Sequence, residues 1–265
     1  MTPTDSLIRY WSDGHADSPA VVLTHGVTIN HRTFDAQVQP LCDAGYRVIT
    51  WDLRGHGASR PSATDFSLQG AVEDLRYVLD ATGVEEAVLV GQSFGGFVIQ
   101  EFFRRYPERV SGLVLVGAHV IGDSLPPHQR LIQRARPWLL TLWPEKHLRR
   151  VLPSFMSRQP EVKQYVADAT SVLSKDDFID VTRAALDAML LSDELHFGDV
   201  SVLAVYGESE FGMIRRMIQQ RETNDPALQV AIIPAAGHLV NQDAPAAFND
   251  VLLAFLQARV PVVGG

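Results

Sequence analysis

The chain contains a single cysteine, Cys42, and this scarcity limits how it can be stabilised. One cysteine excludes an intramolecular disulfide, so stability must come from packing. No apolar run reaches the length of about 18 residues that a membrane-spanning helix needs. Residues 1–14 also lack the basic and then apolar pattern of a signal peptide. These absences predict a cytoplasmic protein with no membrane span, in which Cys42 is an unreactive packed thiol.

Positive charge is scarce as well. The chain has 23 lysines and arginines against 31 aspartates and glutamates, which gives a formal net charge of −8. A protein that binds nucleic acid needs a basic surface to displace counterions, so we expect no nucleic-acid partner. His25 and His31 could suggest a pair of metal ligands. No third ligand shares their spacing, however, and we therefore expect no metal.

Apolar strand-like runs alternate with helical patterns from residue 20 onward. Apolar residues at helical spacing predict a helix that Gly83 ends, another near residues 213–221 and a last one over residues 248–256. Continuous apolar strands separated by helices predict an α/β fold, whose mainly parallel, doubly wound sheet is covered on both faces. The expected strands are residues 20–23, 48–51, 87–90, 110–116, 200–206 and 230–234.

Strand patterns are missing between residues 120 and 197, where the apolar spacing is helical. Ser174 and Asp177 have the spacing of a capping box that begins a helix. We therefore predict a core formed by residues 1–119 and 198–265, into which residues 120–197 are inserted as a helical cap. The cap is expected over the carboxyl ends of the strands, where α/β sheets bind their ligands.

The most informative segment is Gly91-Gln92-Ser93-Phe94-Gly95, which follows an apolar strand and precedes an amphipathic stretch. Gly-x-Ser-x-Gly between a strand and a helix is typical of a nucleophile elbow. Glycines two residues on either side let the backbone turn sharply, so that Ser93 is held at the tip. The three fixed positions alone arise by chance in about one chain in ten of this length, so the surrounding elements carry the interpretation.

A serine hydroxyl becomes a good nucleophile when a base takes its proton and a third group orients that base. The sequence offers both partners at the ends of later strands. Glu208 and Glu210 follow one predicted strand, and Gly237-His238 follows the next. The order serine, acid, histidine is the chain order expected of a nucleophile elbow on a parallel sheet.

With these residues the chain resembles the α/β-hydrolase superfamily, and within it the single-cap, esterase- or lipase-like serine hydrolases. The resemblance covers nearly the whole length and rests also on His25-Gly26 and on residues 52–59, Asp-Leu-Arg-Gly-His-Gly-Ala-Ser. It implies that Ser93 is the nucleophile, His238 the base and Glu210 the acid of a catalytic triad.

The same resemblance implies an oxyanion hole made by the backbone N–H groups of Val27 and Phe94. At the acid position the chain departs from the family pattern, because most of this group has aspartate where this chain has Glu210. Two other carboxylates stay open as the acid. Glu208 lies two residues earlier, and Asp123 follows the strand from which some members draw their acid.

The resemblance implies a cofactor-free serine hydrolase that acts through an acyl-enzyme on a small or medium carboxylic ester, thioester or lactone. The substrate is expected to be a neutral or apolar small molecule, since the chain is acidic overall. The same triad also serves C–C bond hydrolases and perhydrolases. Cofactor-free oxygenases and small-molecule receptors share the fold, and the motifs separate neither these activities nor the oligomeric state.

Other residues of interest have structural explanations as well. His25 and His56 are expected to hold loops in place by hydrogen bonds. Four further side chains either line the substrate pocket or form ordinary packing: His119, Trp138, Trp143 and Phe155.

Overall fold

The computed structural model describes residues 8–60, 66–122, 144–191, 195–210, 227–260 and 262. The strands in these ranges are β1 (Tyr10–Asp13), β2 (Ala20–Thr24), β3 (Arg47–Trp51), β4 (Ala87–Gln92), β5 (Val110–Val116), β6 (Val202–Gly207) and β7 (Leu228–Ile233). They form one sheet in the order β1-β3-β2-β4-β5-β6-β7. The edge strand β1 runs antiparallel to β3 and the other pairs are parallel, which confirms the predicted α/β fold with a mainly parallel sheet.

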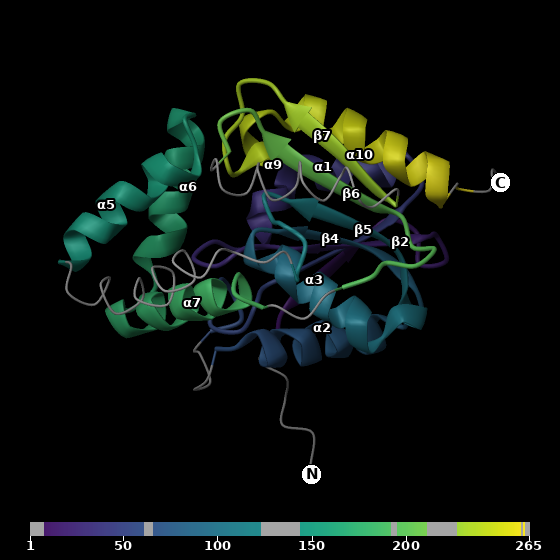
Figure 1. The fold of residues 1–265 in the computed structure, drawn as a ribbon, viewed down its shortest axis with the longest axis horizontal. Coiled ribbons are helices and arrows are strands. Elements are labelled where there is room, and N and C mark those ends of the chain that lie inside the picture. The colour runs from purple at the N-terminus through teal and green to yellow at the C-terminus, as the bar shows by residue number, and fades with distance from the viewer. Residues whose placement is uncertain are drawn as a thin grey trace, which may run out of the picture.

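Helices cover both faces of this sheet (Figure 1). On one face lie α1 (Asp35–Asp43) and α10 (Pro245–Arg259), and on the other lie α2 (Leu68–Thr82) and α3 (Phe94–Arg105). Successive strand residues point to opposite faces, so each strand supplies both layers. In β2, for example, Val22 packs on the α2 and α3 side, whereas Val21 packs on the α1 and α10 side. Two apolar layers therefore enclose the sheet.

The predicted elements agree closely with this arrangement. Strand β5 has the predicted bounds, and the other predicted strands differ from the observed ones by a few residues at their ends. Helix α2 ends at Gly83, which adopts φ 68° as its left-handed C-cap. The helix expected near residues 213–221 lies outside the described residues. Strand β1 was not predicted, because its four residues are mostly exposed and show no apolar pattern.

Helices α5 (Glu145–Met156), α6 (Pro160–Ser171) and α7 (Lys175–Ala188) follow β5 and precede β6. The capping box is confirmed, since the Ser174 hydroxyl accepts the N–H of Asp177 at 3.1 Å at the start of α7. Figure 1 shows the three helices beyond the arrowheads of β5, β6 and β7, at the carboxyl edge of the sheet. The described residues between β5 and β6 contain no strand.

Within the part of the chain that the structure describes, none of the helices combines the length and the apolar character that crossing a bilayer requires.

Strand β4 and helix α3 are joined by a turn with very little free space. Ser93 lies at the turn with φ 52° and ψ −116°, a conformation that few residues other than glycine adopt. A Cβ atom on Gly91 would lie 2.3 Å from the carbonyl oxygen of Gly95. A Cβ atom on Gly95 would lie 2.2 Å from the carbonyl oxygen of Thr24, at the end of β2. Glycine at these two positions allows α3 to begin directly against β4 and β2.

We expect Gly95→Ala to lower the free energy of unfolding by about 3 kcal/mol, because the added methyl group meets backbone atoms and forces α3 or the β2 loop to move. Gly112→Ala is the matched control, since its Cβ would lie 3.5 Å from the side chains of Phe255 and Val88, an ordinary contact distance. Urea unfolding of both variants measures the difference. Equal losses in the two variants would contradict this explanation of the turn.

Candidate active site

Ser93 directly precedes α3 as its N-cap residue, but its side chain makes no hydrogen bond to the helix. Its backbone N–H donates a hydrogen bond of 2.8 Å to the carbonyl oxygen of Val116, at the end of the neighbouring strand β5. Its hydroxyl makes no capping hydrogen bond to α3, although serine is a common N-cap residue. The turn therefore presents a partly exposed hydroxyl at the carboxyl edge of the sheet.

The loop after β2 lies against this serine. A Cβ atom on Gly26 would lie 3.0 Å from the Cβ atom of Ser93, so the backbone leading into Val27 passes directly beside the nucleophile candidate. Phe94 is the first residue of α3, and the first N–H groups of a helix have no partner within it. The fold thus brings the Gly26-Val27 segment and the start of α3 to the same side of Ser93.

His238 and Glu210 form a buried pair at the same edge. The Nδ1 atom of His238 lies 3.0 Å from Oε1 and 3.2 Å from Oε2 of Glu210, so the ring faces both carboxylate oxygens. His238 follows β7 and Glu210 follows β6, and each residue is 5% exposed. Gly117, at the end of β5 with φ 61°, gives the pair room, because a Cβ atom there would lie 3.0 Å from Nδ1 of His238.

This contact determines the protonation of His238. Burial by itself lowers the pKa of the imidazole, but the negative charge and the hydrogen bond of Glu210 act in the other direction. Together with the charge of Asp243 they outweigh the effect of burial, so the net pKa of His238 is raised above its ordinary value. In a neutral imidazole whose Nδ1–H faces a carboxylate, Nε2 is the nitrogen with acceptor character.

The two other carboxylates that the sequence left open as the acid are Glu208 and Asp123. Glu208 accepts the backbone N–H of Ala235 at 3.1 Å through Oε2. Asp123 lies outside the described residues. Glu210 is thus the carboxylate that the structure brings to the ring of His238, while its catalytic role stays a proposal.

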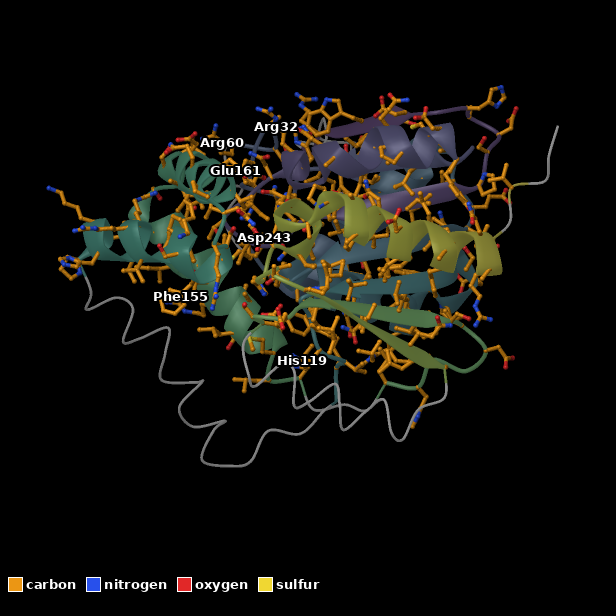
Figure 2. All side chains as sticks on the ribbon, turned by 90° about the horizontal axis from the view of Figure 1, so that it is seen from above. Arg32, Arg60, His119, Phe155, Glu161 and Asp243 are labelled. Carbon is orange, nitrogen blue, oxygen red and sulfur yellow. The ribbon has the colours of Figure 1, made fainter. Side chains whose placement is uncertain are left out.

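The four residues predicted to line a pocket or to pack ordinarily differ in their positions. His119 is buried, with its ring edge-on to Phe97 at 4.9 Å between centroids, and burial lowers its pKa to about 4. Phe155 is 61% exposed and lies one residue before the end of α5 (Figure 2). Trp138 and Trp143 lie outside the described residues.

A cavity of about 410 Å³ lies between the start of α2 and helix α7, within the size range of small-molecule sites. Its described lining does not include Ser93 or His238, but Phe66 connects it to the elbow, because its ring lies 5.2 Å from the ring of Phe94. The lining combines apolar and charged side chains, among them Phe66, Leu68, Ala188, Asp180, Arg183 and Asp187.

Two buried histidines hold the loops beneath the site, as the sequence predicted. Nε2 of His25 accepts the N–H of Leu53 at 2.9 Å, and its Nδ1–H donates to the carbonyl oxygen of Gly26 at 2.6 Å. Nε2 of His56 accepts the N–H of Thr28 at 3.0 Å. Each ring must therefore be neutral. Burial lowers the pKa of His25 to about 4 and that of His56 to about 3, in agreement with this state.

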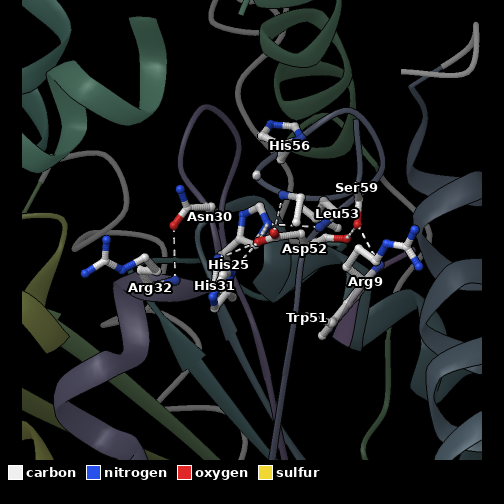
Figure 3. Close-up of polar contacts among 12 residues, drawn as sticks. Arg9, His25, Asn30, His31, Arg32, Trp51, Asp52, Leu53, His56 and Ser59 are labelled. Carbon is white, nitrogen blue, oxygen red and sulfur yellow. Dashed lines mark hydrogen bonds and ion pairs between the residues drawn. The ribbon is translucent and has the colours of Figure 1, made fainter. Parts of the chain in front are cut away.

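Asp52 also takes part in the hydrogen bonds that hold these loops, a role that was not predicted from the sequence. Figure 3 shows His25 and His31 beside Asp52, with His56 above them. One carboxylate oxygen lies 2.8 Å from Nδ1 of His31, and the other accepts the N–H of Ala58 at 2.6 Å. Burial alone would raise the pKa of Asp52, but the hydrogen bonds from His31 and Ala58 act against it, and the net pKa is lowered. The carboxylate therefore ties the loop after β3 to the loop after β2.

The described residues contain no group of three or more histidine, cysteine, aspartate or glutamate side chains that could hold a metal ion. Burial and the neighbouring Asp13 and Asp43 raise the pKa of Cys42, as expected of an unreactive thiol.

The sheet topology, the elbow at Ser93 and the loops that meet beside it define an α/β-hydrolase fold. The alpha/beta hydrolase family matches residues 21–251, and the chain belongs to this family. It is 23% identical to the AB hydrolase superfamily protein YfhM of Bacillus subtilis in an alignment 271 positions long, and the match covers 92% of each chain.

Two further comparisons agree. The chain is 24% identical to carboxylesterase YbfK of Bacillus subtilis over 247 residues, which cover 92% of this chain and 82% of that protein. A solved structure of a hydrolase from Pseudomonas aeruginosa PA01 superposes with a TM-score of 0.78 at 24% identity, and the match covers 94% of both chains. Membership of this family supports a hydrolase.

The neutral histidines give a pH dependence with a defined sign. The pKa values of His25 and His56 are about 4 and about 3 in the folded chain, against about 6.5 in the unfolded chain. Below pH 6.5 the unfolded chain therefore binds more protons, and the stability that these histidines contribute is lost as the pH falls toward 4. We expect the free energy of unfolding to drop by about 2 kcal/mol or more between pH 6.5 and pH 4.5 from this source.

Urea unfolding at the two pH values measures this loss, and His56→Asn isolates the histidine part of it, because asparagine does not titrate there. The variant should lose less stability than the wild type over this interval, while His15→Asn, at an exposed histidine, should behave as the wild type does. An identical loss in the wild type and His56→Asn would contradict the assignment of neutral rings.

Proposed function

We propose that the chain is a serine hydrolase that cleaves small to medium carboxylic esters, with Ser93, His238 and Glu210 as its catalytic triad. The proposal rests first on the buried contact of His238 with both carboxylate oxygens of Glu210, at 3.0 and 3.2 Å, on the sheet edge that carries Ser93. The family and the similarity to a carboxylesterase support it.

In the proposed reaction the Ser93 hydroxyl attacks the carbonyl carbon of the ester while Nε2 of His238 takes its proton. Glu210 holds the ring through Nδ1 and stabilises the imidazolium. The N–H groups of Val27 and Phe94 bind the oxyanion of the tetrahedral intermediate, a contribution of about 3 kcal/mol for each donor in comparable enzymes. His238 then gives its proton to the leaving alcohol, and water activated by the same ring releases the acid from Ser93.

Glutamate in place of the more usual aspartate suits this geometry. The extra methylene lets the carboxylate of Glu210 reach the imidazole from the turn directly after β6, where its N–H donates to the carbonyl oxygen of Gly207 at 3.0 Å. Because the carboxylate is nearly inaccessible to water, its charge acts on His238 with little screening.

The helices between β5 and β6 are proposed as the cap of the predicted insert at residues 120–197, over a core of residues 1–119 and 198–265. They lie where they would limit which substrates reach Ser93. Leu148 of α5 and Phe178 of α7 belong to an apolar cluster with Val27 and Phe66. An apolar cluster beside the proposed oxyanion loop suits neutral or apolar small-molecule substrates. Thioesters and lactones can react by the same steps, and the mechanism requires no cofactor.

A panel of p-nitrophenyl esters of increasing acyl length, from C2 to C12, tests the proposal. We expect turnover of part of the panel by the wild type, and a fall of at least about a thousandfold in kcat/KM for Ser93→Ala. Ser171→Ala, at an exposed serine, is the matched control and should keep the wild-type rate. No activity on any ester of the panel would overturn the esterase proposal.

Two other outcomes separate the alternatives. Oxygen consumption that survives Ser93→Ala but fails in His238→Ala would identify a cofactor-free oxygenase, in which the serine is not the nucleophile. Tight binding of a small molecule without turnover would identify a receptor. Turnover of a diketone, or peracid formation, that depends on Ser93 would instead extend the same triad to C–C bond hydrolysis or perhydrolysis.

A further inference from the structure

The turn between α5 and α6 lies directly on the loop that carries His238. The N–H of Leu239, the residue after His238, donates a hydrogen bond of 3.1 Å to the carbonyl oxygen of Met156, at the end of α5. The next residue, Ser157, is only 2% exposed. A short segment of the inserted helices is thus buried against the histidine loop.

A carboxylate joins these two segments. Asp243, the last residue of α9 (Val240–Asp243), accepts the backbone N–H of Gly237 at 2.7 Å through Oδ2. Its other oxygen, Oδ1, accepts the hydroxyl of Ser157 in a short hydrogen bond. The Ser157 oxygen in turn accepts the N–H of Gln159 at 2.9 Å, so the hydroxyl is held from both sides. Figure 2 shows Asp243 where the C-terminal helices face α5 and α6.

The geometry points to Asp243 and Ser157 as a positioning pair, which fixes His238 from the side of the inserted helices and brings a second negative charge to the histidine loop. This inference rests on the proposed role of His238 as the base. Glu210 orients the ring at Nδ1, whereas Asp243 fixes the backbone one residue before the ring. The two carboxylates therefore hold His238 at different points.

The charged residues around His238 are consistent with separate roles for Glu210 and Asp243. Glu210 and Glu208 lie on the loop after β6, and Asp243 lies on α9; on the α5–α6 turn, the charged residue next to Ser157 is the exposed Arg158. The largest effect on the pKa of His238 is burial, which lowers it, and the next is Glu210, which raises it. The charge of Asp243 is a smaller effect and raises the pKa further. Asp243 thus adds to the stabilisation of the imidazolium from its position on the backbone N–H of Gly237.

The same turn also reaches the loop that carries Val27. Met156 packs in one apolar cluster with Leu239, beside His238, and with Ile29, two residues after Val27. On α6, the hydroxyl of Tyr165 donates to the carbonyl oxygen of Asn30 at 3.0 Å. The proposed base and the proposed oxyanion loop are therefore fixed by the same pair of helices, so a displacement of the α5–α6 turn would move both.

Asp243→Asn tests the pair, because it removes the charge at nearly constant volume. Asp250→Asn, at an exposed carboxylate of α10, is the control for the loss of one negative charge. We expect the pKa of His238, followed by NMR and assigned with His238→Gln, to fall in Asp243→Asn and to stay at the wild-type value in the control. The acidic limb of the kcat/KM profile should shift to lower pH by about half a pH unit or more.

A purely structural role for Asp243 would lower the melting temperature but leave the titration of His238 in place, and that result overturns the inference. The NMR titration needs no catalytic activity. A wild type without esterase activity would therefore contradict the proposed function, while the titration would still decide the role of Asp243.

Ser157→Ala provides a second test and applies also where Asp243→Asn does not fold. It removes one hydrogen bond but keeps the carboxylate charge. We expect kcat/KM to fall about threefold to tenfold, while the acidic limb stays close to its wild-type position. An unchanged kcat/KM would show that the link to the inserted helices does not position His238.

Discussion

The close approach of α3 to the ends of β4 and β2 is the constraint on which the rest of the site depends. Gly95 lies so near the carbonyl oxygen of Thr24 that no side chain fits between them. This approach forces the sharp turn at Ser93, with its positive φ of 52°. It also brings the Gly26-Val27 backbone beside the serine. The hydroxyl, the start of α3 and the loop after β2 are therefore positioned by one packing contact.

The surrounding loops are held mainly by buried polar contacts. His25 and His56 each accept a backbone N–H, and Asp52 accepts two more, which fixes the loops after β2 and β3. The loops after β6 and β7 are joined by the pair of Glu210 and His238. Because buried polar groups are costly when unpaired, such loops resist displacement, and the site is preorganised. Histidine thus has two structural settings in this fold. His238 faces the carboxylate of Glu210, whereas His25 and His56 each accept a backbone N–H and hold a loop.

Much of this was predictable from the sequence, because the strands are continuous apolar runs and chemical residues follow directly at their ends. Ser93, Glu210 and His238 were singled out in that way as candidates, and the parallel sheet explains why they share an edge. Strand β1 was missed, and with it Trp11, which stacks on His31 at 3.7 Å. The contact of Ser157 with Asp243 joins residues 86 positions apart, and no local pattern marks it. Contacts of this kind depend on how the inserted helices pack, and helical spacing alone does not specify that packing.

The central claim is that Ser93 is a nucleophile activated by His238. Labelling with a fluorophosphonate, followed by mass mapping of the peptides, tests it most directly. The account predicts one adduct per chain, on the peptide that contains Ser93, and labelling slowed by about a thousandfold in His238→Gln. An adduct on a different residue, or labelling of Ser93 at the same rate in His238→Gln, would contradict it.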